Sequence, residues 1–273
     1  MSEERQHSIY GVDFSGAKDA GKRIWVARGA VEGDGLRVLS CRRGEALPGS
    51  DRRRQACLAA LGSRIRRSGP SVWGFDFPFG LPESLVDEAS WTSFVLAFPE
   101  TYESADAFRQ ACREAADGRE LKRLTDREAK APFSAYNLRL FRQTYYGIRD
   151  LLYPLVRDNA VCVLPMQEAV PGRPWLLEIC PACTLKEADL YQASYKGRED
   201  ARQEARARIV GALEERRALI LGEETRSKVI EDKGGDALDS VIAALAAARA
   251  LRAPGLPAFD PGNPHAMEGY IYT

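Results

Sequence analysis

The chain begins with three short runs rich in β-branched and aromatic residues, separated by glycine and charged residues. The runs cover residues 8–14, 23–31 and 35–43, and their composition is typical of strands. The gap between the second and third runs, EGDG at residues 32–35, predicts a tight hairpin. After Asp51, apolar residues recur at Cys57, Leu58, Leu61 and Ile65, the spacing of an amphipathic helix. We therefore expect three antiparallel strands and then a helix.

The pattern then alternates between strand and helix signals. Residues 71–77 predict a strand that PFGLP ends, which places Asp76 at its C-terminal end. Residues 83–158 carry long helical patterns with little strand signal, so we expect a helical insertion there. Residues 160–165 and 175–180 predict two more strands, with Glu178 close to the end of the second.

Two helical segments complete the chain. Residues 198–221 predict a charged helix, and a final helix begins at GGDALDS, residues 234–240, and continues with small and apolar residues up to Arg249. The order of elements predicts an α/β fold with a mixed sheet flanked by helices. We expect a single domain over residues 1–273, with the helical insertion at about 83–158.

Composition narrows the class of protein. The 45% hydrophobic content suits a globular core, and 39 basic residues balance 39 acidic ones, so nucleic-acid binding would depend on local patches. The N-terminus lacks the apolar segment of a signal peptide, and the longest apolar run, residues 241–248, is too short to cross a bilayer. We expect a cytoplasmic protein without a membrane partner, in which six scattered cysteines are reduced thiols.

Carboxylates stand at the ends of several predicted elements. These are Asp13, Asp76, Glu178, Asp236 and Asp239. In a sheet of this kind, reactive groups gather at the C-terminal edge of the strands. Clustered carboxylates repel one another unless a cation lies between them, and Mg²⁺ or Mn²⁺ prefers oxygen ligands. A simpler alternative stays open for Asp236 and Asp239, because acids at this position also cap a helix N-terminus.

Five motifs resemble one family along almost the whole chain. They are GVDFSGAK at 11–18, WGFDFPFGLP at 73–82, TDREAKAPFS at 125–134, EICPACTLKE at 178–187 and GGDALDSVIAALAA at 234–247, and the closing EGYIY also matches. The family is the predicted ribonuclease H-like nucleases grouped as domain of unknown function 429. The resemblance implies a ribonuclease H-like fold with a metal-binding acidic cluster.

The same resemblance implies roles for the acids. Asp13 resembles the first-strand acid of such enzymes, and Asp76 or Glu178 the acid from a later strand. Asp236 and Asp239 resemble the C-terminal-helix acids of Holliday-junction resolvases. All five acids are therefore catalytic candidates, and Asp13, Asp236, Asp239 and Glu178 are the candidate metal ligands.

The candidates for substrate binding come from two segments. Arg123, Arg127 and Lys130 belong to a basic run that forms either a phosphate-binding lip or a solvated helix face. Three further candidates for substrate binding lie within the motifs that resemble the family: Ser15, Lys18 and Asp126.

Other chemistries fit the residues less well. GAKDAGKR at 16–23 approaches a P-loop, but Arg23 replaces the Mg²⁺-binding hydroxyl and a strand follows. The chain has two histidines, which argues against nucleophilic triads. CPAC at 180–183 has the spacing of a redox dithiol, although we favour small core cysteines.

The leading hypothesis is a Mg²⁺- or Mn²⁺-dependent nuclease or other phosphodiester hydrolase that acts on nucleic acid or another phosphoester. One alternative is an ATP-binding phosphotransferase of the actin-like kinase type, which would use Asp13, Ser15 and Gly16 near the phosphates. Another is a non-catalytic nucleic-acid-binding or scaffold protein.

Overall fold

The computed structural model describes residues 8–191, 194–252 and 259–273. Its strands form one sheet in the order β5-β6-β4-β1-β2-β3-β7, with β8 also beside β6. The strands are β1 (Ser8–Asp13), β2 (Trp25–Glu32), β3 (Gly35–Arg43), β4 (Ser71–Phe75), β5 (Cys162–Leu164), β6 (Trp175–Ile179), β7 (Leu219–Leu221) and β8 (Ile271–Tyr272). β2 is antiparallel to β1 and β3, and the other pairs are parallel. The expected mixed α/β sheet is confirmed.

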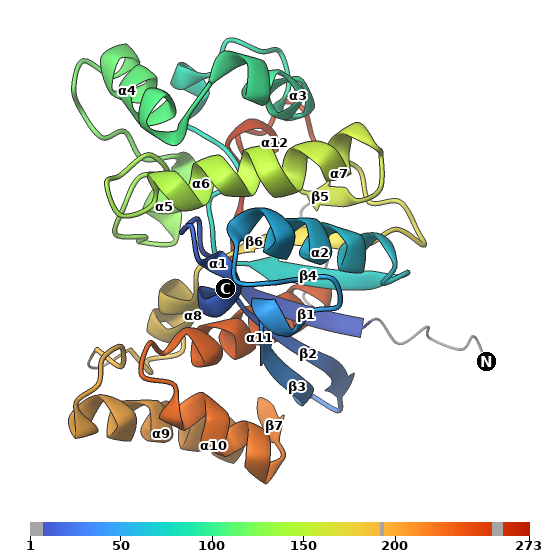
Figure 1. Cartoon of the computed structure of the whole chain (residues 1–273), viewed down its shortest axis with the longest axis vertical. Coiled ribbons are helices and arrows are strands. Elements are labelled where there is room, and N and C mark those ends of the chain that lie inside the picture. The colour runs from blue at the N-terminus through green and yellow to red at the C-terminus, as the bar shows by residue number, and fades with distance from the viewer. Residues whose placement is uncertain (1–7, 192–193, 253–258) are drawn as a thin grey trace.

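Helices cover both faces of this sheet (Figure 1). One face packs against α2 (Arg54–Arg66) and the helices between β4 and β5. The other face packs against α8 (Pro181–Glu187), α9 (Asp200–Glu215), α10 (Glu223–Glu231) and α11 (Asp236–Arg252). Two buried apolar clusters result, one on each face, because alternate residues of a strand point to opposite sides.

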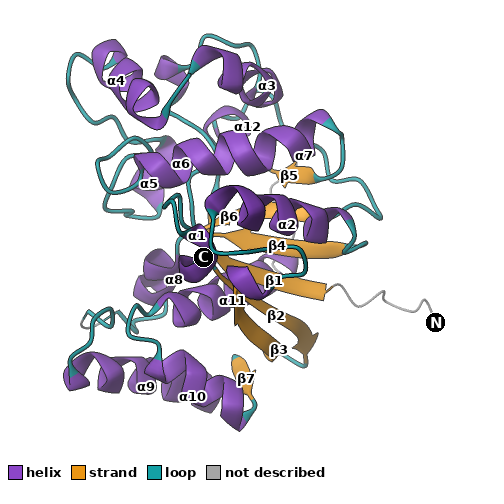
Figure 2. Ribbon diagram, viewed as in Figure 1, coloured by secondary structure: helices purple, strands orange, loops and turns teal. Residues whose placement is uncertain are grey.

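Residues 83–158 are helical, as expected, and contain no strand (Figure 2). Their elements are η2 (Glu83–Leu85), α3 (Trp91–Thr101), α4 (Ala105–Ala115), α5 (Leu124–Glu128), α6 (Phe141–Gly147), the π-helical turn η3 (Ile148–Leu152) and α7 (Tyr153–Arg157). Ser90 and Ser104 begin α3 and α4 by accepting hydrogen bonds from the backbone N–H groups of Ser93 and Ala107. The inserted helices lie over the α2 side of the sheet.

Helix α11 is buried over nearly its whole length, from Ala237 to Ala250. A helix that is apolar on all sides belongs in a core, and α11 lies across β1, β2, β3 and β4. The side chain that accepts a hydrogen bond from its first turn is Asp232, whose Oδ2 is 3.1 Å from the N–H of Ala237. The capping role considered for Asp236 therefore belongs to an acid four residues earlier.

The structure corrects several local expectations. The helix predicted over residues 198–221 ends at Glu215, and Leu219–Leu221 form β7 beside β3. Arg217, between them, has a φ of 54°, which ends helical geometry. The loop between β1 and β2 contains the short helix α1 (Ala20–Arg23), and another, α12 (His265–Glu268), precedes β8. Within the described residues, no helix is both long and apolar enough to cross a membrane.

Candidate functional site

Asp13 and Asp76 lie side by side at one edge of the sheet. Asp13 is the last residue of β1, and Asp76 directly follows β4. The two strands are parallel neighbours, and the backbone N–H of Asp76 donates to the carbonyl oxygen of Val12 at 3.0 Å. Both acids therefore stand where strand direction brings the C-terminal ends together, as the sequence predicts.

Asp239 reaches the same edge because α11 approaches the sheet unusually closely. A Cβ atom at Gly11 would lie 2.1 Å from the carbonyl oxygen of Ser240, and one at Gly74 would lie 2.6 Å from that of Ala243. Only glycine permits this approach of backbone to backbone. Gly11 and Gly74 are paired across β1 and β4 and lie two residues before Asp13 and Asp76. Alternation along each strand therefore turns both acids toward α11.

The three aspartates form one cluster. Carboxylate oxygens of Asp13, Asp76 and Asp239 all lie within 4.8 Å of one another. Asp13 and Asp239 are buried, and Asp76 is partly exposed. Within residues 8–191, 194–252 and 259–273, no other trio of acidic, histidine or cysteine side chains converges in this way. An all-oxygen donor set of this kind fits a hard divalent cation such as Mg²⁺ or Mn²⁺.

Two neighbouring residues hold the Asp239 carboxylate. The hydroxyl of Tyr195 donates to Oδ1 at 2.6 Å, and Nζ of Lys196 lies 2.5 Å from Oδ2. Tyr195 is buried, whereas the Lys196 side chain is 49% exposed and directs its ammonium inward. This ammonium supplies positive charge at the acidic cluster.

The electrostatics of the cluster favour protonation or cation binding. Burial raises the pKa of Asp13 well above its ordinary value and that of Asp76 to about 7, and nearby carboxylates raise both further. Lys196 acts in the opposite direction on both groups. The carboxylate of Asp239 raises the pKa of Lys196, which stays charged. Burial also raises the pKa of Tyr195, so its hydroxyl remains a donor.

Asp236 lies beside the cluster but is not one of its three converging acids. It is the first residue of α11 and is partly buried. Burial raises its pKa, and repulsion from Asp232 and Asp239 adds to the effect while Lys196 opposes it. The charges of Asp239 and Lys196 therefore act on Asp236, although its carboxylate is not part of the cluster of three aspartates.

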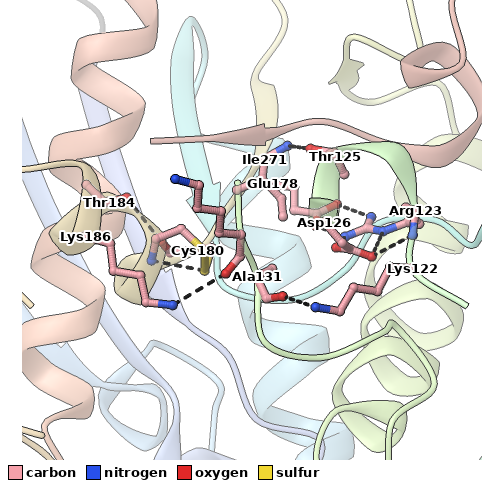
Figure 3. Close-up of a disulfide and its surroundings, with 12 residues drawn as sticks. Lys122, Arg123, Thr125, Asp126, Ala131, Glu178, Cys180, Thr184, Lys186 and Ile271 are labelled. Atoms are coloured by element: carbon pink, nitrogen blue, oxygen red, sulfur yellow. Dashed lines mark hydrogen bonds and ion pairs between the residues drawn. A yellow bond between two sulfur atoms is a disulfide. The ribbon is translucent and has the colours of Figure 1, made fainter. Parts of the chain in front are cut away.

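Glu178 occupies a different environment, shown in Figure 3. It pairs with Phe75 across β6 and β4 and so points away from α11, toward the side of the inserted helices. Its Oε1 and Oε2 accept hydrogen bonds from Arg123 at 2.5 and 2.8 Å, and Oε2 also accepts one from the N–H of Phe79 at 2.8 Å. With its oxygens engaged in this way, Glu178 does not join the expected metal-binding set.

Arg123 and Asp126 belong to this buried ion-pair network rather than to an open basic lip. Arg123 is 1% exposed, and its guanidinium also contacts Asp126 at 2.8 Å. Asp126 accepts a second hydrogen bond, at 3.0 Å, from the backbone N–H of Arg123 at the start of α5. The ion pair between Arg123 and Glu178 therefore joins the helical insertion to β6. Arg123 and Asp126 also line a pocket that includes Asp76 and Asp239.

The other substrate-binding candidates, Ser15, Lys18, Arg127 and Lys130, lie in the loop after β1 and in or just after α5. The hydroxyl of Ser15 accepts a hydrogen bond from the N–H of Ala17 within its own loop. Lys18, Arg127 and Lys130 are exposed, and Arg127 donates to the carbonyl oxygen of Lys122 at 2.6 Å. These contacts do not join the four side chains into one binding site.

The cysteines divide into two groups. Cys41, Cys57, Cys112 and Cys162 are buried free thiols, as expected. Cys180 and Cys183 form a disulfide at the start of α8 (Figure 3), which corrects the expectation that all six are reduced. The spacing C-x-x-C indicates that the two cysteines can meet, because a helical turn brings residues three apart onto one side.

Sequence reasoning missed Tyr195 and Lys196. They stand in a segment without periodic pattern, more than forty residues before Asp239, and no motif marks them. Their role appears only when the segment before α9 lies against α11.

Comparisons with known proteins do not identify a function for this site. A scan against protein-family models finds no match, and neither do searches of curated proteins and of solved structures. The function of the site must therefore be inferred from its own residues and from the motifs described above.

Proposed function

We propose that this chain is a divalent-metal-dependent phosphodiester hydrolase with a ribonuclease H-like sheet. The observation that carries the proposal is the convergence of Asp13, Asp76 and Asp239, whose carboxylate oxygens lie within 4.8 Å of one another. These three residues would hold Mg²⁺ or Mn²⁺. Such an ion polarises a phosphoryl oxygen and activates water when bound.

The surrounding residues have roles that suit this chemistry. Tyr195 orients the Asp239 carboxylate through its hydrogen bond to Oδ1. Lys196 brings its ammonium to the site and would pair with a phosphate oxygen when a metal takes its place at Asp239. Asp236, partly buried beside the cluster, would contact water or the leaving group rather than complete the ligand set.

The arrangement of elements supports the ribonuclease H-like interpretation. The sheet opens with three antiparallel strands and continues with parallel ones, and its acids come from β1, from the end of β4 and from α11. This is the order that the resemblance to domain of unknown function 429 implies, and it keeps nucleic acid as the proposed substrate class.

The phosphotransferase alternative is less well supported. It would place ATP phosphates at Ser15 and Gly16, yet α6 covers that loop. Gln143 donates to the carbonyl oxygen of Phe14 at 2.5 Å, and a Cβ atom at Gly16 would lie 2.3 Å from the carbonyl oxygen of Arg142. Little room remains there for phosphate groups.

The proposal is tested by isothermal titration calorimetry, in which Mn²⁺ is titrated into the wild type and into an Asp13→Asn/Asp239→Asn variant. We expect binding to the wild type and its loss in the variant. Asp117→Asn is the matched control, because the Asp117 side chain is 87% exposed and pairs with Arg119 instead of joining the cluster. Far-ultraviolet circular dichroism establishes that all three proteins are folded.

Turnover is then measured with labelled DNA, RNA and ATP. We expect Mn²⁺-dependent cleavage of a polynucleotide by wild type and Asp117→Asn, but not by the double variant. Absence of carboxylate-dependent Mn²⁺ binding would refute the proposal. Cleavage of ATP alone would favour a phosphotransferase, and metal binding without turnover a scaffold.

A further inference from the structure

A pocket of about 220 Å³ adjoins the carboxylate cluster. Asp76, Asp239 and Lys196 form one charged part of its lining, and the buried ion pairs of Arg123 with Asp126 and Glu178 form another. Much of the remaining wall is apolar or aromatic and includes Phe77, Pro78, Pro132, Phe133, Leu140 and Tyr191. The pocket thus combines a phosphoester-competent group of charges with a surface suited to an apolar ring.

The size of the pocket limits what can enter it. Pockets that enclose a drug-sized ligand measure about 300–1,000 Å³. A volume of about 220 Å³ is smaller, and it suits a single ring system rather than a complete ligand. A base inside a duplex is stacked between neighbours and cannot enter such a pocket unless it leaves the stack.

The aromatic residues of the wall retain surface for a ligand. Phe133 is partly exposed, and its ring centroid is 5.2 Å from the guanidinium carbon of Arg139. Tyr191 is 39% exposed, and it meets the buried ring of Tyr195 edge to face at 5.9 Å. Partly exposed rings held in place by neighbours provide stacking surfaces for a planar base, largely without regard to its identity.

We propose that this pocket binds one unstacked nucleobase whose phosphoester lies at Asp76, Asp239 and Lys196. The inference rests on the proposed function, because it takes the carboxylate cluster as the place of the phosphoester. The substrate is then a nucleotide or a single-stranded nucleic acid rather than a duplex. Both sources present the same chemistry, a planar base joined through a sugar to phosphate.

Binding is tested with two probes that differ only by the base, adenosine 5′-monophosphate and ribose 5-phosphate, each titrated into the full chain with Mn²⁺. We expect the nucleotide to bind about tenfold more tightly, as stacking of one base predicts. Phe133→Ala and, separately, Tyr191→Ala should reduce this preference at least threefold without changing the affinity for ribose 5-phosphate. Leu138→Ala is the control, since Leu138 is 65% exposed and does not line the pocket.

Equal affinity for the two probes, or a preference that survives both Phe133→Ala and Tyr191→Ala in folded protein, would overturn the inference. Thermal unfolding establishes that each variant is folded. Using two variants keeps the test decisive if one of them fails to fold.

Cleavage assays separate this inference from the proposed function. With matched single-stranded and duplex oligonucleotides and Mn²⁺, we expect faster cleavage of the single strand. If a mononucleotide ester is cleaved more slowly than the single strand, the substrate is single-stranded nucleic acid rather than a free nucleotide. A base-dependent preference in binding without any cleavage would support the pocket and refute the hydrolase. Equal cleavage of single strand and duplex, with no preference in binding, would refute the pocket and support the hydrolase.

Discussion

Lys196 places its ammonium 2.5 Å from Oδ2 of Asp239, inside a group of carboxylates that suits a divalent cation. The ammonium therefore occupies part of the charge-compensating role that a metal ion would take. A metal that takes Oδ2 must compete with Lys196 or displace it. This relationship makes the lysine a direct test of the site.

Replacing Lys196 by methionine should tighten Mn²⁺ binding by about tenfold, equivalent to about 1.4 kcal/mol, because the competing cation is gone. In EDTA the same variant should be less stable by about 1 kcal/mol, since the side chain is half exposed and its ion pair is screened. Calorimetry and thermal unfolding measure the two effects.

Lys186→Met provides the control, because Lys186 is exposed and its ammonium contacts a backbone carbonyl, that of Lys130 at 3.5 Å. We expect little change in either measurement. A loss of Mn²⁺ affinity in Lys196→Met would contradict competition and make the lysine a positioning group for the metal site.

The pH dependence of stability should carry the signature of Asp76. Its pKa rises from 3.8 to about 7 on folding, so the folded protein retains a proton that the unfolded chain loses between these values. The contribution of Asp76 therefore makes the protein less stable as pH rises through this window. Asp76→Asn should make that fall smaller when melting temperatures are measured in EDTA from pH 4 to pH 8, and the remainder comes from Asp13 and Asp236, whose pKa values are also raised.

Mn²⁺ binding should show the opposite trend, because the ligands must lose their protons before they bind metal. We expect affinity to increase as pH rises through about 7, the pKa of Asp76. Affinity that is constant from pH 5.5 to pH 8 would mean that this carboxyl does not bind the ion.

Glu178→Gln should separate stability from metal binding. The change leaves the buried charge of Arg123 without one of its two carboxylate partners, which should cost about 3 kcal/mol in the free energy of unfolding. Mn²⁺ affinity should remain within about twofold, because both carboxylate oxygens of Glu178 already accept hydrogen bonds from Arg123.

Urea unfolding and calorimetry check these expectations, with the exposed Glu187→Gln as the control. If Glu178→Gln stays folded but no longer binds Mn²⁺, Glu178 belongs to the metal site after all.

Gly11→Ala should move α11 away from the sheet. The new methyl group would meet the backbone of Ser240 and Ala244 at 2.1 and 2.2 Å, so we expect a loss of about 3 kcal/mol and weaker Mn²⁺ binding as Asp239 shifts. Gly211→Ala in α9 has open space around its Cβ position and should stabilise the protein by up to about 1 kcal/mol. Similar urea curves for the two variants would contradict the close approach of α11.

Most elements of the fold can be predicted from the sequence because they depend on local patterns of apolar residues. Alternating and continuous apolar runs predict β1, β2, β3, β4 and the helical insertion, since the period of apolar residues reflects which side chains are buried. The short β7 and β8 escape the same reasoning. Three or two residues contain no period, and partners far along the chain, β3 and β6, make them strands.

The sequence by itself determined that acids stand at strand ends and at the start of the last helix. Which acids meet was decided by tertiary structure. The register across β1, β4 and β6 puts Val12, Phe75 and Glu178 in one row on the face away from α11, and turns Asp13 and Asp76 toward Asp239. Register and helix position arise from contacts between distant segments, so the partnership of Glu178 with Arg123, and of Asp239 with Lys196, exists only in the folded chain.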